Sequence, residues 1–270
     1  MRGVEGTRFE VDGLAGERWG EGRPDYVLLH AGVADRRSWR DVAPALDAPS
    51  VAYDRRAFGE TPRATGPFRH LDDLLGLVDA VAEGKPVWLV GNSMGGALAI
   101  DAALEAPERV AGLVLISPGV TGLPEDAEIA PTPAEDAMDA AWRAAGDDLE
   151  ARLRLEAWLW LDGPAEEGRV GGAARELALD MNRRILEHDV PDDVGASGFG
   201  AFGRLGELDM PVTVACGDLE NSEQLWICER IVDRVRGARQ VVLPRTAHLP
   251  GLDAPAALAE AIVQARTSGR

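Results

Sequence analysis

A serine within a glycine-rich segment is the first residue whose surroundings suggest chemistry. The segment Gly91-Asn92-Ser93-Met94-Gly95-Gly96 follows the apolar run 87–90 and precedes a stretch with helical spacing. A serine at such a strand-to-helix turn needs small neighbours, because its backbone is strained and the helix packs close to the strand. The turn exposes the hydroxyl, and the Met94 N–H at the helix start can stabilise an anion. The segment therefore predicts a nucleophilic serine; the alternative interpretation is a helix-capping serine between glycines.

A serine hydroxyl is a poor nucleophile without a base, and His248 is the histidine best placed to be one. It lies in Thr246-Ala247-His248-Leu249-Pro250, between the last predicted strand and the final helix, at the same sheet edge as Ser93. The other three histidines have structural interpretations: His30 ends a predicted strand and shapes the adjoining loop, and His70 and His188 belong to helix surfaces.

The imidazole in turn needs a carboxylate that orients it and stabilises its protonated form. Gly217-Asp218-Leu219-Glu220 follows the strand that ends at Cys216, on the edge where Ser93 and His248 are expected. Asp218 lies nearer the strand end, and Glu220 lies two residues further into the loop. The residue types and positions alone favour neither acid.

The elements that must position these residues follow an α/β pattern. Short apolar runs alternate with helical stretches at residues 71–81 and 97–104, and the runs cover residues 26–29, 51–53, 87–90, 110–116, 211–216 and 241–243. The runs are continuous rather than alternating, as is typical of parallel strands covered on both faces. Residues 7–11 and 18–20 are expected to form an antiparallel hairpin at the sheet edge.

The alternation of apolar runs and helical stretches stops after Pro118. Residues 121–133 contain prolines and acids and predict a loop, and helices only are expected around Trp142, over 149–161 and over 173–186. We therefore expect two core segments, 1–120 and 206–270, separated by a helical cap at 121–205. Such an insertion at the carboxyl ends of the strands would cover a site there. Trp142, Trp158 and Trp160 either line an apolar pocket under the cap or pack the cap onto the core.

Over nearly its whole length the chain resembles the α/β-hydrolase superfamily. Ser93, Glu220 and His248 follow that superfamily's order of nucleophile, acid and base. His30-Ala31-Gly32, ahead of Trp39, resembles its His-Gly oxyanion loop, with Ala31 where glycine is common. Asp54-Arg55-Arg56-Ala57-Phe58-Gly59-Glu60-Thr61 resembles its Asp-x-Arg-Gly-x-Gly-x-Ser/Thr segment, with Ala57 at a glycine position. Gly217-Asp218-Leu219-Glu220 resembles its Gly-acid-x-Asp motif, whose last position is the catalytic acid.

The resemblance implies an α/β-hydrolase fold: a mostly parallel sheet with helices on both faces and an inserted helical cap. It implies that Glu220 is the triad acid, with Asp218 as the fallback. It implies that the N–H groups of Met94 and Gly32, or of Val33 in place of Gly32, receive the oxyanion. The candidate pocket residues are His30, Trp39, Trp142, Trp158 and Trp160. No metal or organic cofactor is expected.

The expected activity is hydrolysis of a small, largely apolar carboxylic ester or lactone through an acyl-enzyme. The Ser93 segment is also similar to that of esterases, enol-lactonases and hydrolases that cleave C–C bonds in ring-fission products. Other motifs resemble an actinobacterial group of α/β-hydrolases with no settled substrate, namely His30-Ala31-Gly32-Val33-Ala34-Asp35, Trp160-Leu161-Asp162-Gly163-Pro164 and Arg169-Val170-Gly171-Gly172. The alternatives are C–C bond hydrolysis of a vinylogous diketone acid and a non-catalytic binding protein with the same cap.

The amino-acid composition limits the classes of molecule that the protein is expected to bind. Acids outnumber bases 46 to 28, giving a formal net charge of −18, which disfavours nucleic acids and anionic membranes. Two cysteines cannot form a disulfide framework, and Cys228 is expected to be buried. There is no signal-peptide pattern and no apolar run near the roughly 20 residues of a membrane span. We expect a cytoplasmic monomer or homodimer with a small-molecule substrate.

Two arginine pairs, Arg36-Arg37 and Arg55-Arg56, could hold a substrate carboxylate. We interpret them instead as braces that pair with nearby acids and hold loops in place.

Overall fold

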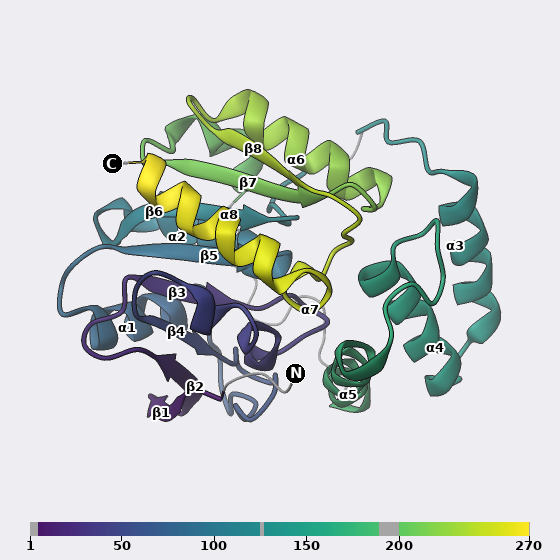
Figure 1. The fold of residues 1–270 in the computed structure, drawn as a ribbon, viewed down its shortest axis with the longest axis horizontal. Helices are drawn as coiled ribbons and strands as arrows, with labels where there is room; N and C mark the ends of the chain where they lie inside the picture. The colour runs from purple at the N-terminus through teal and green to yellow at the C-terminus, as the bar shows by residue number, and fades with distance from the viewer. Residues whose placement is uncertain (1–4, 125–126, 189–199, 270) are drawn as a thin grey trace.

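The computed structural model describes residues 5–124, 127–188 and 200–269. In these residues the chain forms a central sheet with helices on both faces and a further group of helices beyond one end of the sheet (Figure 1). The strands are β1 (Thr7–Val11), β2 (Leu14–Trp19), β3 (Tyr26–Leu29), β4 (Ser50–Tyr53), β5 (Val87–Asn92), β6 (Val110–Ile116), β7 (Val212–Gly217) and β8 (Arg239–Leu243).

The strand order across the sheet is β1-β2-β4-β3-β5-β6-β7-β8. β2 pairs antiparallel with both β1 and β4, and all other neighbouring strands pair in parallel. The prediction of a mostly parallel sheet is confirmed. The expected edge hairpin is also present, although its second strand begins at Leu14, earlier than residue 18.

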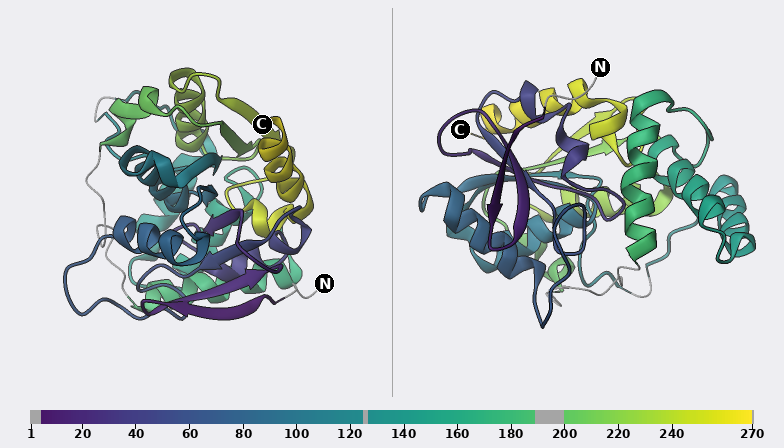
Figure 2. Two further views of the ribbon diagram at one scale, coloured as in Figure 1. Left: turned by 90° about the vertical axis from the view of Figure 1, so that its left-hand side faces the viewer. Right: turned by 90° about the horizontal axis from the view of Figure 1, so that it is seen from below.

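Helices cover both faces of the sheet, with α1, α2 and α6 on one face and α8 on the other (Figures 1 and 2). None of the described helices is long and apolar enough to cross a membrane. The α-helices are α1 (His70–Ala82), α2 (Met94–Glu105), α3 (Pro133–Ala145), α4 (Leu149–Glu156), α5 (Gly172–His188), α6 (Ser222–Arg234), α7 (Pro250–Asp253) and α8 (Pro255–Ser268). Short 3-10 helices are η1 (Arg36–Trp39), η2 (Ala43–Ala45), η3 (Pro107–Arg109) and η5 (Ala201–Glu207), and η4 (Ala157–Asp162) is a π-helix.

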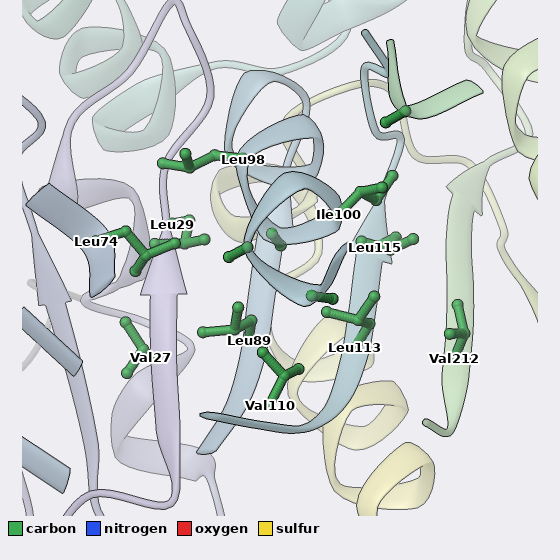
Figure 3. Close-up of a cluster of buried hydrophobic side chains, with 14 of the residues drawn as sticks. Val27, Leu29, Leu74, Leu89, Leu98, Ile100, Val110, Leu113, Leu115 and Val212 are labelled. Carbon is green, nitrogen blue, oxygen red and sulfur yellow. The ribbon is translucent and has the colours of Figure 1, made fainter. Parts of the chain in front are cut away.

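Burial on both faces explains why the central strands read as continuous apolar runs. In β3, Val27 and Leu29 belong to the cluster under α1, α2 and α6, whereas Tyr26 and Leu28 pack toward α8. Figure 3 shows the first cluster, in which Leu74 and Leu98 from the helices lie beside Leu29 of the sheet. β8 lies at one edge of the sheet, and most of its side chains are exposed or half-buried.

The helices between β6 and β7 stand apart from this core. α3, α4, η4 and α5 lie beyond the carboxyl ends of the parallel strands (Figure 1), and we call them the cap helices. The two ends of this excursion meet: the Thr121 carbonyl accepts the Phe202 N–H at 2.9 Å, and the Thr121 hydroxyl accepts the Ala201 N–H at 3.1 Å. Because Phe202 and Leu205 are buried in the core cluster, the chain rejoins the core by residue 201, and the boundary expected at 205 falls inside η5.

Candidate active site

Ser93 occupies the sharp turn between β5 and α2. Its backbone has φ 54° and ψ −118°, a strained conformation for a residue with a side chain. The flanking glycines make the turn possible. A Cβ atom at Gly91 would lie 2.3 Å from the Gly95 carbonyl oxygen, and one at Gly95 would lie 2.3 Å from the Leu29 carbonyl oxygen. The sequence therefore folds here into the turn expected of an activated serine.

The loop after β3 approaches the same turn. A Cβ atom built on Gly32 would lie 3.4 Å from Cε of Met94, so Gly32 and the start of α2 are neighbours. Among the described residues, the N–H groups of Gly32, Val33 and Met94 donate to no backbone carbonyl. These free donors, beside the positive end of the α2 dipole, can receive a negatively charged oxygen.

His248 is paired with Glu220. Nδ1 of His248 lies 2.9 Å from Oε1 of Glu220, and their side chains are each 1% exposed. Asp218 is exposed and instead accepts the Thr246 N–H at 3.3 Å. Of the two acids that the residue pattern left open, Glu220 is therefore the one that can orient the imidazole. With Nδ1 facing Glu220, Nε2 remains to exchange a proton.

The residue before Ser93 ties the histidine loop to the serine turn. The side-chain amide of Asn92 donates to the His248 carbonyl and to the Ile116 carbonyl, both at 3.0 Å. Asn92 ends β5 and is buried, so these bonds fix the spacing between the end of the strand and the histidine loop. The sequence analysis did not identify this role. A polar residue at the end of a buried strand, next to the serine, was the signal for it.

His30 holds the Gly32 loop rather than lining a pocket. Its side chain is fully buried; Nε2 accepts the Arg55 backbone N–H at 3.1 Å, and Nδ1 donates to the Ala31 carbonyl at 2.7 Å. Burial and the Arg55 cation lower the pKa of His30 well below its ordinary value, so the ring is neutral. The expectation that His30 contacts substrate is wrong, because both ring nitrogens are used within the protein.

Arg55 holds the same loop. Its guanidinium, 1% exposed, donates to the carbonyls of His30 and Ala31 at 2.8 and 3.1 Å. Burial lowers its pKa to about 10. It makes no ion pair with a described carboxylate and so departs from the brace that we expected. The other paired arginines match that interpretation: Arg36 contacts Asp54, Arg37 contacts Asp35, and Arg56 contacts Asp73.

The tryptophans divide into different roles. Trp160 of η4 packs on the catalytic candidate His248, with ring centroids 4.6 Å apart. Trp142 is 39% exposed and faces an outer groove, and Trp158 is not among the residues that line the two cavities beside η4. Trp39 is 2% exposed within the core cluster under α8, so its assignment to the pocket is wrong.

The expectation of a surface position for His70 is also wrong, because His70 is buried and packs against Phe58 and Phe68. The side chain of His188 lies outside the described residues.

The cap helices are anchored to the loops that carry Glu220 and His248. Arg169 makes a two-pronged ion pair with Asp253, at 2.9 and 2.6 Å, and also donates to the Arg245 carbonyl at 2.9 Å. Asp253 also accepts the Ala247 N–H at 3.4 Å. Gly163 touches the acid loop: a Cβ atom there would lie 2.5 Å from the Leu219 carbonyl oxygen. Two motifs with no assigned role in the sequence, around Trp160 and Arg169, thus join the cap helices to the site.

Two spaces adjoin Trp160. One lies between the cap helices and the core; its empty space of about 230 Å³ includes open solvent, and it is lined by Val33, Leu153, Glu156, Ala157, Trp160, Leu161, Ala178, Leu179, Asn182 and Leu249. The other is a groove between α3 and the α4–η4 segment; its empty space of about 590 Å³ also includes open solvent, and it is lined by Met138, Asp139, Trp142, Leu155, Glu156, Leu159 and Trp160. Among the described residues, no three His, Cys, Asp or Glu side chains are arranged to hold a metal ion.

Comparison with known proteins identifies the family of the chain. A model of the alpha/beta hydrolase family matches residues 26–261. The chain belongs to this family. Among curated relatives, the hydrolase is 27% identical over 256 residues to the pimeloyl-[acyl-carrier protein] methyl ester esterase of Pectobacterium atrosepticum, covering 90% of this chain and 94% of that protein.

Solved structures share the hydrolase fold. A thermophilic esterase from Thermogutta terrifontis superposes with a TM-score of 0.71 at 24% identity, over 100% of both chains. A meta-cleavage product hydrolase from Pseudomonas fluorescens superposes with a TM-score of 0.73 at 20% identity, over 98% of this chain and 99% of that one. At these identities the likeness shows the fold and leaves the reaction to the site itself.

Proposed function

We propose that this hydrolase cleaves a small, largely apolar carboxylic ester or lactone through a Ser93-His248-Glu220 triad. The buried contact between His248 and Glu220, on a loop that Asn92 ties to the serine turn, is the observation that carries the proposal. A neutral imidazole oriented by a carboxylate is what a serine hydroxyl needs to become a nucleophile at neutral pH.

In the proposed reaction, Ser93 Oγ attacks the carbonyl carbon while Nε2 of His248 accepts the hydroxyl proton. The carbonyl oxygen becomes an oxyanion and is received by the N–H groups of Met94 and Gly32. His248 then gives its proton to the leaving alkoxide, which departs as an alcohol or, from a lactone, stays attached to the acyl chain. Water, deprotonated by His248, attacks the acyl-enzyme; the acid is released and His248 returns the proton to Ser93 Oγ. Glu220 stabilises the imidazolium in both halves of the reaction.

Hydrolysis of a C–C bond in a ring-fission acid has less support. That substrate carries a carboxylate and calls for a cationic contact in the pocket. Arg169 and Arg175 near the site are paired with Asp253 and Asp162, and the Arg55 guanidinium is buried and donates to the carbonyls of His30 and Ala31. We therefore favour the ester or lactone.

The test is turnover of p-nitrophenyl butyrate by the protein and by Ser93→Ala, together with labelling by a fluorophosphonate. We expect Ser93→Ala to lose about 10⁴-fold or more of the rate and all of the labelling, since triad members act as a unit. More than a tenth of the activity remaining in Ser93→Ala would reject the assignment. A protein that neither hydrolyses esters nor reacts with the probe would instead be a binding protein.

A further inference from the structure

Two segments from the region between β6 and β7 contact the chain on either side of Glu220. Before Glu220, Gly163 lies against the Leu219 carbonyl, in the close approach described above. After Glu220, the carboxylate of Glu135 on α3 accepts two hydrogen bonds from Ser222, one from its backbone N–H at 2.6 Å and one from its hydroxyl at 2.9 Å. The loop at residues 218–221, which we call the acid loop, is therefore held from both sides.

The carboxylate of Glu135 joins α3 to α6. Its Oε1 accepts both bonds from Ser222, whereas its Oε2 accepts the Thr132 N–H and completes the capping box of α3. Ser222 is the first residue of α6, so its N–H has no acceptor within that helix. Glu135 supplies this acceptor from a distant part of the chain, and its negative charge lies at the positive end of the α6 dipole.

The charge of Glu135 strengthens this contact. Burial raises the pKa of Glu135, but the hydrogen bonds from Thr132 and Ser222 outweigh burial and hold the pKa below its ordinary value. The carboxyl group is therefore ionised at neutral pH. Hydrogen bonds to an ionised acceptor are stronger than those between neutral groups.

The start of α6 is close enough to Glu220 to set its position. Glu220 lies two residues before Ser222, and its side chain is 1% exposed beside His248. Asn221, between them, is buried and accepts the Gln224 N–H at 2.9 Å as the cap of α6. Two residues span at most about 7 Å of chain, so a displaced start of α6 moves the backbone that carries the Glu220 carboxylate.

We propose that Glu135 is a positioning residue for the triad: it holds the start of α6, and with it the acid loop, where Glu220 meets His248. This inference rests on the proposed function and adds a residue of α3 that acts through Glu220. A displacement of about 1 Å in a reacting group can cost about 10²-fold in rate, so the two hydrogen bonds from Ser222 bear on kcat.

Glu135→Leu tests the proposal, because it removes the acceptor and keeps a side chain of similar size. We expect kcat to fall about threefold to tenfold, with KM changed by less than about twofold. The loss should be equal for p-nitrophenyl acetate and p-nitrophenyl butyrate, since a misplaced acid slows proton transfer whatever the acyl chain. A kcat within twofold of the unmodified protein, or a loss that appears in KM or only with the longer ester, would overturn the proposal.

Two further variants test the hydrogen bonds themselves. Glu135→Gln keeps an oxygen that can accept from Ser222, so it should retain most of the kcat that Glu135→Leu loses. Ser222→Ala removes the hydroxyl donor and keeps the N–H, and its kcat should fall by about twofold to threefold. Equal losses in Glu135→Gln and Glu135→Leu contradict the proposal. If Glu135→Leu does not fold, an unchanged kcat in Ser222→Ala overturns it.

The same turn of α3 offers two matched controls. Asp136 is the exposed acid next to Glu135, and Asp136→Asn changes the net charge by the same amount. Thr132→Ala removes the hydroxyl that accepts the Glu135 N–H at 3.3 Å and leaves both bonds from Ser222 in place. Both variants should keep kcat within twofold. A loss in either one that equals the loss in Glu135→Leu would assign the effect to charge or to the end of α3, against the proposal.

The two proposals fail in different ways. If the unmodified protein cleaves both esters but Glu135→Leu keeps its kcat, the positioning inference is wrong and the esterase proposal stands. If the unmodified protein cleaves neither ester and the fluorophosphonate does not label Ser93, the esterase proposal itself is wrong.

Discussion

The side-chain amide of Asn92 donates a hydrogen bond to the backbone carbonyl of His248 at 3.0 Å. Asn92 precedes the proposed nucleophile, so this bond connects the serine turn to the loop that carries the proposed base. The same amide donates to Ile116 of the neighbouring strand at 3.0 Å. The relative position of serine and histidine is thus set by the sheet and not only by the histidine loop.

Replacing Asn92 should therefore impair the reaction more than binding. We expect Asn92→Leu to lower kcat by about tenfold to a hundredfold, since the His248 carbonyl loses this donor and the histidine loop is released. KM should change much less. Steady-state kinetics on p-nitrophenyl butyrate measure both parameters, with thermal unfolding as a check that the variant is folded. A kcat within twofold of the unmodified protein would show that Asn92 does not position His248.

Glu220 and Asp218 form a matched pair for testing the acid. Glu220→Gln keeps the size of the side chain but removes the charge that stabilises the imidazolium, and we expect a loss on the order of 10⁴ in kcat. Asp218→Asn changes an exposed residue whose contact is the Thr246 N–H, and its kcat should stay within a few-fold. The opposite ranking of the two variants would move the role to Asp218.

The ion pair of Arg169 with Asp253 is expected to stabilise the protein and to support catalysis. Its side chains are 8% and 9% exposed, and removing one partner leaves a buried charge, so Arg169→Ala should lower the free energy of unfolding by about 3 kcal/mol. Activity should fall as well, because Arg169 contacts Arg245 in the histidine loop. Arg183→Ala is the matched control: it breaks an exposed pair with Glu150 within the cap helices and should change stability much less than Arg169→Ala does. Chemical denaturation of both variants measures the difference, and equal losses would contradict the anchoring role.

A buried ion pair near the sheet edge gives a prediction about pH. Glu17 is fully buried and contacts Arg40 and Arg36; burial raises its pKa, but the two arginines outweigh burial and hold it below the ordinary 4.5. A carboxylate with a lowered pKa stabilises the folded state above its unfolded pKa, and this stability is lost as the pH falls through the folded pKa. Glu17→Gln should therefore be less stable by about 3 kcal/mol at about pH 7.

The deficit of Glu17→Gln should shrink once the pH falls below about 4.5, as the unmodified Glu17 becomes protonated. Urea unfolding across this pH range provides the measurement. The exposed Glu10→Gln serves as control and should show little difference at any pH. A deficit that stays constant down to low pH would rule out the charge as its cause.

Local sequence predicted the sheet, the strained turn at Ser93 and the loop positions of His248 and its acidic partner, because each depends on patterns within a few residues. Continuous apolar runs require burial on both faces, and glycines at 91 and 95 leave room for the close turn. The choice between Asp218 and Glu220 could not be made from the local sequence. It depends on the path of the loop, which decides which carboxylate reaches His248.

The tryptophans show what the sequence could not predict. Trp39 packs in the core and Trp160 packs on His248, although both are large apolar residues near candidate motifs. The difference between Trp158 and Trp160 depends on the π-helix η4, whose wider turn shifts the helical phase away from a period of 3.6 residues. We expected Arg55 and Arg56 to share the role of pairing with acids because they are neighbours in the sequence. Side chains of neighbouring residues point in different directions, however, and of the two only Arg56 contacts a described carboxylate.

The chain leaves the core at Thr121 and returns at Ala201 and Phe202, and hydrogen bonds join these two points. This arrangement has a consequence for how such a protein can evolve. The strands of the sheet and the proposed triad lie outside the segment between these two points. Transplanting residues 122–200 from a related hydrolase would therefore join onto the scaffold at two adjacent backbone positions. Diversification of substrate choice can proceed by recombination of that one segment, while the reactive centre is inherited intact.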